Sequence, residues 1–192
     1  MRVVLIALLA AVVTAGLCWG SFVAGGSDSY CYLHQAEGWA SGVLQVPEPM
    51  ALDAPWPDAP LTFAPAGHRP SPTVPGAIVP ICPPGLSMAM APFVALAGID
   101  AAFLIVPLFG ALLIGATWAV GTRFGPHIGL ASACMAACSP VFLYQLMQPM
   151  SDVPAAALWM AAVAFVTNCS LPVEAGFFCC KYPLISALGL LL

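Results

Sequence analysis

The chain has 192 residues, of which 61% are hydrophobic and 6% charged, and its formal net charge is −4. A soluble domain has about 25% charged residues, so this composition excludes an ordinary soluble domain and indicates an integral membrane protein with lipids as its surroundings. The four Lys and Arg residues are scattered along the chain, so no nucleic-acid partner is expected.

The first apolar run covers Val3–Ala24, 22 residues that follow Arg2. About 20 residues cross a bilayer core, whereas the apolar core of a cleaved signal peptide has about 7–15. The run therefore predicts a retained first transmembrane helix, with Arg2 on the cytoplasmic side.

A loop of sixty residues follows, from Gly25 to Pro84. Its first part, Ser27–Trp39, predicts a helix with Ser27 as the N-cap. Twelve prolines between Pro47 and Pro84 forbid a regular helix. They predict extended and looped backbone outside the hydrocarbon.

Four further apolar segments follow the loop. Leu86–Ala97 would cover only ~18 Å as a helix, against a bilayer core of ~30 Å. Ala101–Val120 and Ile128–Met147 are long enough to span, with a kink expected at Pro140, and Val153–Thr167 starts another helix. The fold class predicted is an all-α multi-pass membrane protein with about four transmembrane helices and a long external first loop containing short surface helices.

Two topologies are open, and they differ in the role of Leu86–Ala97. If this segment crosses the membrane, Arg123 lies outside and Asp152 inside. If it lies along the surface or dips in and returns, Arg123 is cytoplasmic and Asp152 shares the outer face with Asp28. The short length and the preference for positive charge inside favour the second topology.

Asp28 and Asp152 are the candidate acids at the membrane boundary. Each could simply be a solvated charge or part of a helix start. The functional alternative for Asp28 is a general base or a ligand of a divalent cation, which needs an ionised oxygen. The two acids together could share a cation such as Mg²⁺ or Mn²⁺, because acids at a membrane boundary are expensive unless they are used.

Other polar residues of the loop are candidate substrate contacts. Tyr30, His34 and Glu37 fall three to four residues apart and share one face of the predicted helix. Tyr30 fits an interfacial aromatic position as well as a sugar-stacking one, and the other two could face water instead. Arg69 could meet a phosphate or be solvated.

Pro83 and Pro84 have the character of a helix start, where proline sets φ and needs no N–H. Of the eight cysteines, only Cys31 and Cys82 fall in the loop. A disulfide between them is possible if the loop faces an oxidising compartment.

The order of three segments resembles the N-terminal part of the GT-C membrane glycosyltransferases. The segments are GGSDSYCYLHQAEGW, PICPPGLSMAMAPF and SPVFLYQLMQPMSDVPAAALWMAAVAF. The resemblance covers residues 3 to 167 and points to the family 39 kind, which includes the protein O-mannosyltransferases and the aminoarabinose transferases. It makes 1–167 the N-terminal part of a GT-C-like domain with an external loop over 25–84.

The resemblance implies transfer of a sugar from a polyprenyl-phosphate donor to an acceptor on the non-cytoplasmic face of the bacterial inner membrane. It implies that Asp28 is the catalytic acid of the first loop and that Asp152, in the next external loop, helps to bind a metal or orient substrate. Tyr30, His34, Glu37, Arg69, Pro83 and Pro84 are then the expected substrate-binding residues.

The chain departs from the family pattern at several places. Cys82 stands where a tyrosine often precedes the proline pair, and residues 101–106 lack the arginine often found there. About four spans are expected in this chain. The composition changes after Asn168, so residues 168–192 have the character of a truncated or frame-altered tail. The alternatives are therefore an inactive fragment of such an enzyme and, third, a small membrane transport protein, which would want charges inside its spans.

Overall fold

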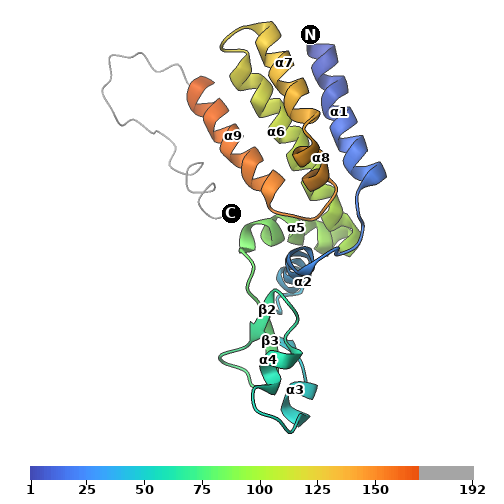
Figure 1. Ribbon diagram of the computed structural model, residues 1–192, viewed down its shortest axis with the longest axis vertical. Helices are drawn as coiled ribbons and strands as arrows, with labels where there is room; N and C mark the ends of the chain where they lie inside the picture. The colour runs from blue at the N-terminus through green and yellow to red at the C-terminus, as the bar shows by residue number, and fades with distance from the viewer. Residues whose placement is uncertain (169–192) are drawn as a thin grey trace, which may run out of the picture. The chain divides into compact units, whose positions relative to one another are not determined.

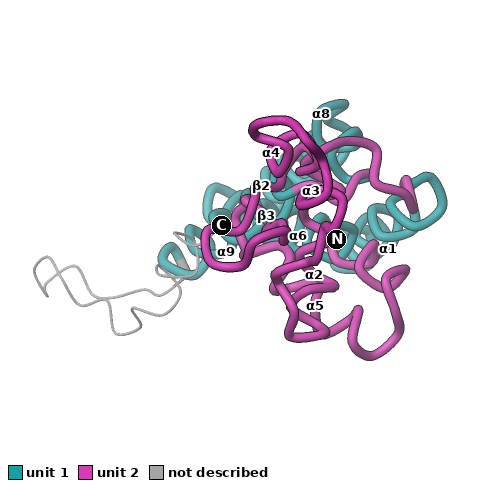
Figure 2. The backbone as a smooth tube through the Cα atoms, turned by 90° about the horizontal axis from the view of Figure 1, so that it is seen from below, with its two compact units in different colours: residues 1–20, 106–147, 151–192 teal, residues 21–105, 148–150 magenta. Residues whose placement is uncertain are grey.

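The computed structural model describes residues 1–168, which are mostly helical and form two compact units. The first unit contains residues 1–20, 106–147 and the described residues from 151 onward. The second contains residues 21–105 and 148–150 (Figure 2). The prediction of an incomplete or altered tail concerns residues that lie almost wholly outside the described part of the chain.

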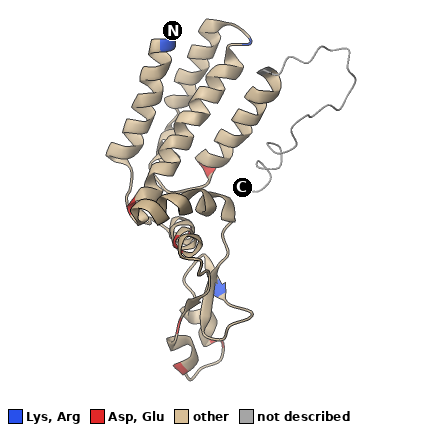
Figure 3. Ribbon diagram, turned by 180° about the vertical axis from the view of Figure 1, so that it is seen from behind, with Lys and Arg blue, Asp and Glu red and all other residues tan. Residues whose placement is uncertain are grey.

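The first unit is built from apolar helices that carry few charged residues (Figures 1 and 3). They are α1 (Arg2–Trp19), α6 (Ile105–Gly121), α7 (Pro126–Ala137), α8 (Pro140–Leu146) and α9 (Asp152–Asn168). Helix α1 packs against α7, and α8 packs against both α7 and α9. Many large apolar side chains of these helices are exposed, Val3 to 79% and Trp159 to 57%, which suits helices surrounded by lipid.

Close packing between α6 and α7 depends on two glycines. A Cβ on Gly121 would lie 2.8 Å from the Cα of Gly129. A Cβ on Gly129 would lie 2.9 Å from the carbonyl oxygen of Trp118. Both distances are shorter than van der Waals contact, so this turn of the chain has room only for glycine. Small residues allow helix backbones to approach in the same way inside membranes.

Two helices are long and apolar enough to cross a membrane, Arg2–Trp19 and the continuous helical run Ile99–Gly121. A third candidate is the pair Pro126–Ala137 and Pro140–Leu146, if this bent pair counts as one span. The described chain therefore offers two or three candidate spans, fewer than the four expected, and Pro84–Ala97 and Asp152–Thr167 are shorter apolar helices.

The first helix ends earlier than predicted. It stops at Trp19, and Gly20 has extended dihedral angles (φ −64°, ψ 151°), so Ser21–Ala24 is not helical. The kink predicted at Pro140 is confirmed as a break of 62°. Its cause is local, because Ser139 is extended at ψ 124° before a proline that can begin a helix but not continue one.

The second unit pairs two helices around a small core (Figure 1). Helix α2 (Ser27–Ser41) packs against α5 (Pro84–Ala97), and both contact the 3₁₀ helix η1 (Ile99–Leu104). Leu86 and Met90 of α5 are fully buried, whereas Leu96 is 87% exposed. Helix α5 thus buries one side against α2 and leaves a charge-free apolar side uncovered.

The all-α prediction is wrong for the proline-rich part of this unit. It forms an antiparallel sheet in the order β1 (Val46–Pro47), β3 (Ala77–Pro80) and β2 (His68–Pro70). Each strand ends in a proline, which lacks the N–H that a longer ladder would need. Short helices also form there, α3 (Met50–Asp53) and α4 (Ala59–Phe63), so the prolines limit helix length without excluding helix.

Candidate functional site

Helix α2 begins at Ser27, one residue earlier than a helix with Ser27 as its N-cap would begin. The N-cap is Gly26, and Ser29 closes the first turn. The Ser29 hydroxyl accepts from the N–H of Gly26 at 3.0 Å and donates to its carbonyl oxygen at 3.1 Å. Ser29 is only 2% exposed, so the start of the helix is anchored from inside the unit.

Asp28 lies in this first turn with its side chain exposed. It makes no side-chain cap, and the Ser27 hydroxyl donates to its Oδ1 at 3.4 Å. Asp28 is therefore not the N-cap of α2, and its exposed position in the first turn is compatible with both the helix-start and the functional interpretation. A negative charge there is favoured by the partial positive charge of the helix N-terminus.

The predicted helix face brings Tyr30 and His34 together, with ring centroids 5.5 Å apart in a stacked arrangement. A residue that was not predicted, His68 of β2, joins them. Its ring centroid lies 4.9 Å from that of His34 and 5.4 Å from that of Tyr30. Nδ1 of His34 and Nε2 of His68 are 2.7 Å apart, so one donates a hydrogen bond to the other.

His68 is the more buried imidazole of the pair, with 7% of its surface exposed. Burial lowers the pKa of His68, the neighbouring His34 lowers it further, and the nearby backbone of Ala66 opposes the shift. Nδ1 of His68 is buried and makes no well-aligned hydrogen bond. The environment therefore favours a neutral His68 ring.

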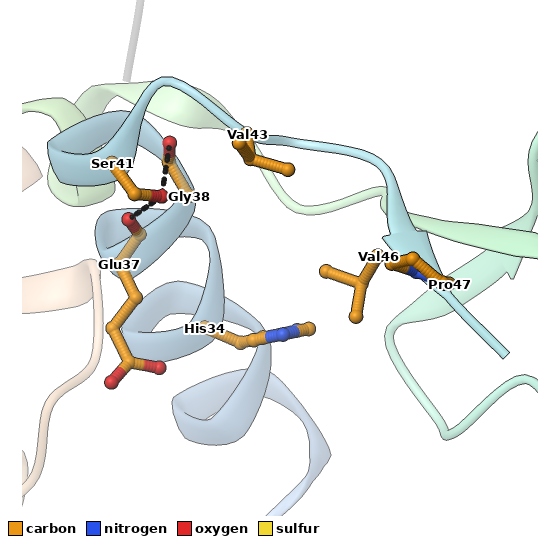
Figure 4. Close-up of a pocket in the computed structure, with 7 residues that line it drawn as sticks. All are labelled: His34, Glu37, Gly38, Ser41, Val43, Val46 and Pro47. Atoms are coloured by element: carbon orange, nitrogen blue, oxygen red, sulfur yellow. Dashed lines mark hydrogen bonds between the residues drawn. The ribbon is translucent and has the colours of Figure 1, made fainter.

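A cavity of about 210 Å³ adjoins this cluster (Figure 4). His34 and Glu37 both line it, whereas Tyr30, predicted on the same face of α2, does not. In Figure 4 the His34 ring points toward Val46, whereas the Glu37 carboxylate points away from it. The remaining lining residues are Gly38, Ser41, Val43, Val46 and Pro47.

Arg69 does not join His34, although it follows His68 in the strand. Side chains alternate along a strand, so Arg69 is exposed on the other side of β2. It lines a separate cavity of about 380 Å³ together with Gln35 and Thr73. A phosphate contact at Arg69 would therefore lie outside the cavity beside His34.

The proline pair acts as the helix start that its sequence indicates. Pro83 is the N-cap of α5 and Pro84 is its first residue. Neither proline lines the two cavities just described. Their predicted role in substrate binding stays a prediction.

The disulfide that the sequence analysis gave as possible, between Cys31 and Cys82, is present. It ties α2 to the segment that leads into α5, and the Cα atoms are 6.2 Å apart. Gln35 supports the same junction, because its side-chain amide donates to the carbonyl oxygen of Cys82 at 3.4 Å. The covalent bond fixes the helix that carries Asp28, Tyr30 and His34.

Asp152 is exposed and begins α9, as its helix-start interpretation predicts. It belongs to the first unit and Asp28 to the second, so their shared cation site stays a prediction. Among the residues described, no group of three or more His, Cys, Asp or Glu could hold a metal ion.

His68 is the residue that sequence reasoning missed. It adjoins Arg69 in the segment AGHRP, but nothing local signals that its ring turns inward to meet a helix 34 residues earlier. That contact depends on the pairing of β2 with β3, which is a long-range event.

Comparison with known proteins identifies no relative: no protein-family model matches the chain, and neither does any curated protein or solved structure.

Proposed function

We propose that the chain is the N-terminal part of a GT-C-type membrane glycosyltransferase of the bacterial inner membrane, with about four spans. In this proposal the second unit lies on the non-cytoplasmic side and binds the sugar of a polyprenyl-phosphate donor. The observation that carries the proposal is the arrangement on α2. One disulfide-anchored helix presents an exposed carboxylate, Asp28, and a Tyr30–His34 pair beside a cavity.

The Cys31–Cys82 disulfide supports the placement of the second unit, because disulfides persist in oxidising compartments such as the periplasm. Helix α5 supports it as well. It has 14 residues and no charge, and Met88 and Leu96 are exposed to 53% and 87%. A helix of this kind suits the membrane surface better than water and is too short to cross. Arg2 and Arg123 are then cytoplasmic.

The reaction would be an inverting displacement at the anomeric carbon. The acceptor hydroxyl oxygen forms the new bond to that carbon, and the bond from the carbon to the phosphate oxygen breaks. The polyprenyl phosphate leaves with the electron pair, and the acceptor proton passes to the Asp28 carboxylate. Asp28 can take this role because it is exposed and free of a capping interaction.

The test uses the full chain in phosphatidylcholine nanodiscs with undecaprenyl phosphate carrying radiolabelled mannose, glucose or aminoarabinose. Release of label from the lipid fraction is followed over time, with acceptor supplied as a periplasmic extract. With one of these donors we expect transfer, and Asp28→Asn should lower its rate by about 10²–10⁴-fold, the usual contribution of a general base.

Asp53→Asn is the matched control, since Asp53 is another exposed acid of the second unit and should leave the rate unchanged. Transfer that survives Asp28→Asn would remove Asp28 from the reaction. No transfer with any donor would overturn the enzyme proposal and support the inactive fragment.

A further inference from the structure

Two imidazole rings are hydrogen-bonded to each other at the contact between α2 and the β2–β3 hairpin. Nδ1 of His34 faces Nε2 of His68 across 2.7 Å, and Tyr30 stacks against the pair. The hydrogen bond requires that one of these nitrogens carries a proton and the other does not. It therefore exists only while at least one ring is neutral.

Protonation of both rings would change this contact from attractive to repulsive. Two N–H groups would then face one another across a hydrogen-bonding distance, and two positive charges would repel with little water between them. Only 7% of His68 is exposed, so screening there is weak. The buried Nδ1 of His68 has no well-aligned hydrogen-bond partner, and the backbone of Ala66, which favours the charged ring, is outweighed by burial and by His34.

The groups around the pair do not neutralise that charge. On α2, Asp28 is exposed in the first turn, and the Glu37 carboxylate points away from the His34 ring (Figure 4). Helix α4, which packs against β2, contains no titratable side chain, and Asp58 before it is exposed. On β2, Arg69 is exposed on the opposite side of the strand. Strand β3 (Ala77–Pro80) and the cavity residues of segment 43–47 contain no titratable side chain.

We propose that the His34–His68 pair is a proton-operated latch that holds the three-stranded sheet against α2 and releases it when both rings are protonated. Because β1 pairs with β3 and β3 with β2, the sheet moves as one body. Val46 and Pro47 of β1 form the wall of the cavity opposite His34. Release of the latch therefore widens this cavity.

The disulfide limits the movement to a local one. Cys31 remains bonded to Cys82, and the N–H of Ile81 donates to the carbonyl oxygen of Gly67 at 3.0 Å, which holds the base of the hairpin beside α2. These two links stay in place when the His34–His68 contact is lost, so the second unit opens without unfolding. This opening is a property of the second unit and does not depend on glycosyl transfer.

The experiment follows two signals from the full chain in phosphatidylcholine nanodiscs between pH 8 and pH 4.5. Imidazole NMR of ¹⁵N-histidine-labelled protein reports protonation, and the three histidines can be assigned by single substitution. Hydrogen exchange of residues 43–47 and 68–80, corrected for intrinsic pH dependence, reports the opening. We expect a rise of about tenfold in corrected exchange on acidification, in step with protonation of the two rings of the latch.

His34→Asn and His68→Gln place an amide where each facing nitrogen stood, so the contact can persist without titrating. Both variants should keep the neutral-pH protection and lose the acid response, whereas His127→Asn, the control in the first unit, should respond like the unaltered chain. Exchange in the unaltered chain that is the same at both ends of the pH range would overturn the latch. So would an acid response that survives in both variants, or one that disappears with His127→Asn.

Discussion

Gly67 lies directly against the disulfide: a Cβ at position 67 would stand 2.8 Å from the Cβ of Cys31, and the backbone there has φ +85°. Both features require glycine, one for space and one for the left-handed backbone. The β2 strand starts at the next residue, so this contact sets where the sheet leaves α2.

Gly67→Ala should therefore destabilise the second unit by about 2–3 kcal/mol, the sum of a strained φ and an overlap that the disulfide cannot relieve. Thermal unfolding in detergent, followed by circular dichroism, measures the effect. Gly42→Ala is the matched control, because Gly42 has φ +75° with no atom within 4 Å of the added Cβ. Only the strain of about 1 kcal/mol is expected there. Equal losses at the two positions would contradict the packing argument.

Removal of the disulfide should weaken the same unit. Cys31 and Cys82 are 51 residues apart, so the bond closes a long loop of the unfolded chain. Cys31→Ser is expected to cost about 2–5 kcal/mol in the free energy of unfolding. Denaturant titration of the oxidised protein gives this value, and dithiothreitol should lower the stability of the unaltered chain by a similar amount. Cys18→Ser removes a free, exposed thiol and should change neither result.

Local signals account for the features that the sequence predicted well. Apolar runs and prolines determine α5, the start of α9 and the break before Pro140, because each depends on residues within one or two helical turns. The early end of α1 at Trp19 was missed since hydropathy continues to Ala24, whereas the backbone is already extended at Gly20. Apolar character alone does not make a helix continue.

The sheet and the imidazole pair depend on contacts that no local pattern reveals. Strands of two to four residues carry almost no periodic signal, and their prolines predicted irregular backbone. His34 and His68 meet only because β2 pairs with β3 and the disulfide holds the hairpin base at α2. The family resemblance and the pairing of Asp28 with Asp152 stay predictions.

The contact between α6 and α7 offers a test of membrane-type packing in the first unit. In Gly129→Ala the new Cβ would meet the carbonyl oxygen of Trp118 and the amide nitrogen of Thr122, both at 2.9 Å. Since backbone atoms cannot rotate away, we expect a loss of about 2–4 kcal/mol, measured by unfolding in mixed micelles.

Gly115→Ala, in contrast, should raise the free energy of unfolding of the first unit. The nearest atom to a Cβ there is a Leu9 methyl at 4.0 Å, so alanine adds helix propensity without a clash. A gain of about 0.5–1 kcal/mol is expected. If both alanines destabilise alike, glycine acts in this unit through flexibility and not through close approach.

The lowered pKa of His68 makes stability depend on pH in a defined direction. Its pKa in the folded protein lies below the ordinary value of 6.5, so the unfolded chain binds more protons between those two values. Stability is therefore full above pH 6.5 and falls as the pH drops from 6.5 toward the folded-state pKa. The melting temperature of the second unit should decrease over this interval. His68→Gln removes the titrating group and should flatten that part of the curve, whereas His127→Asn should leave the fall in place. A melting temperature that rises on acidification below pH 6.5 would show that the buried ring gains a partner for its charge, contrary to the desolvation described for it.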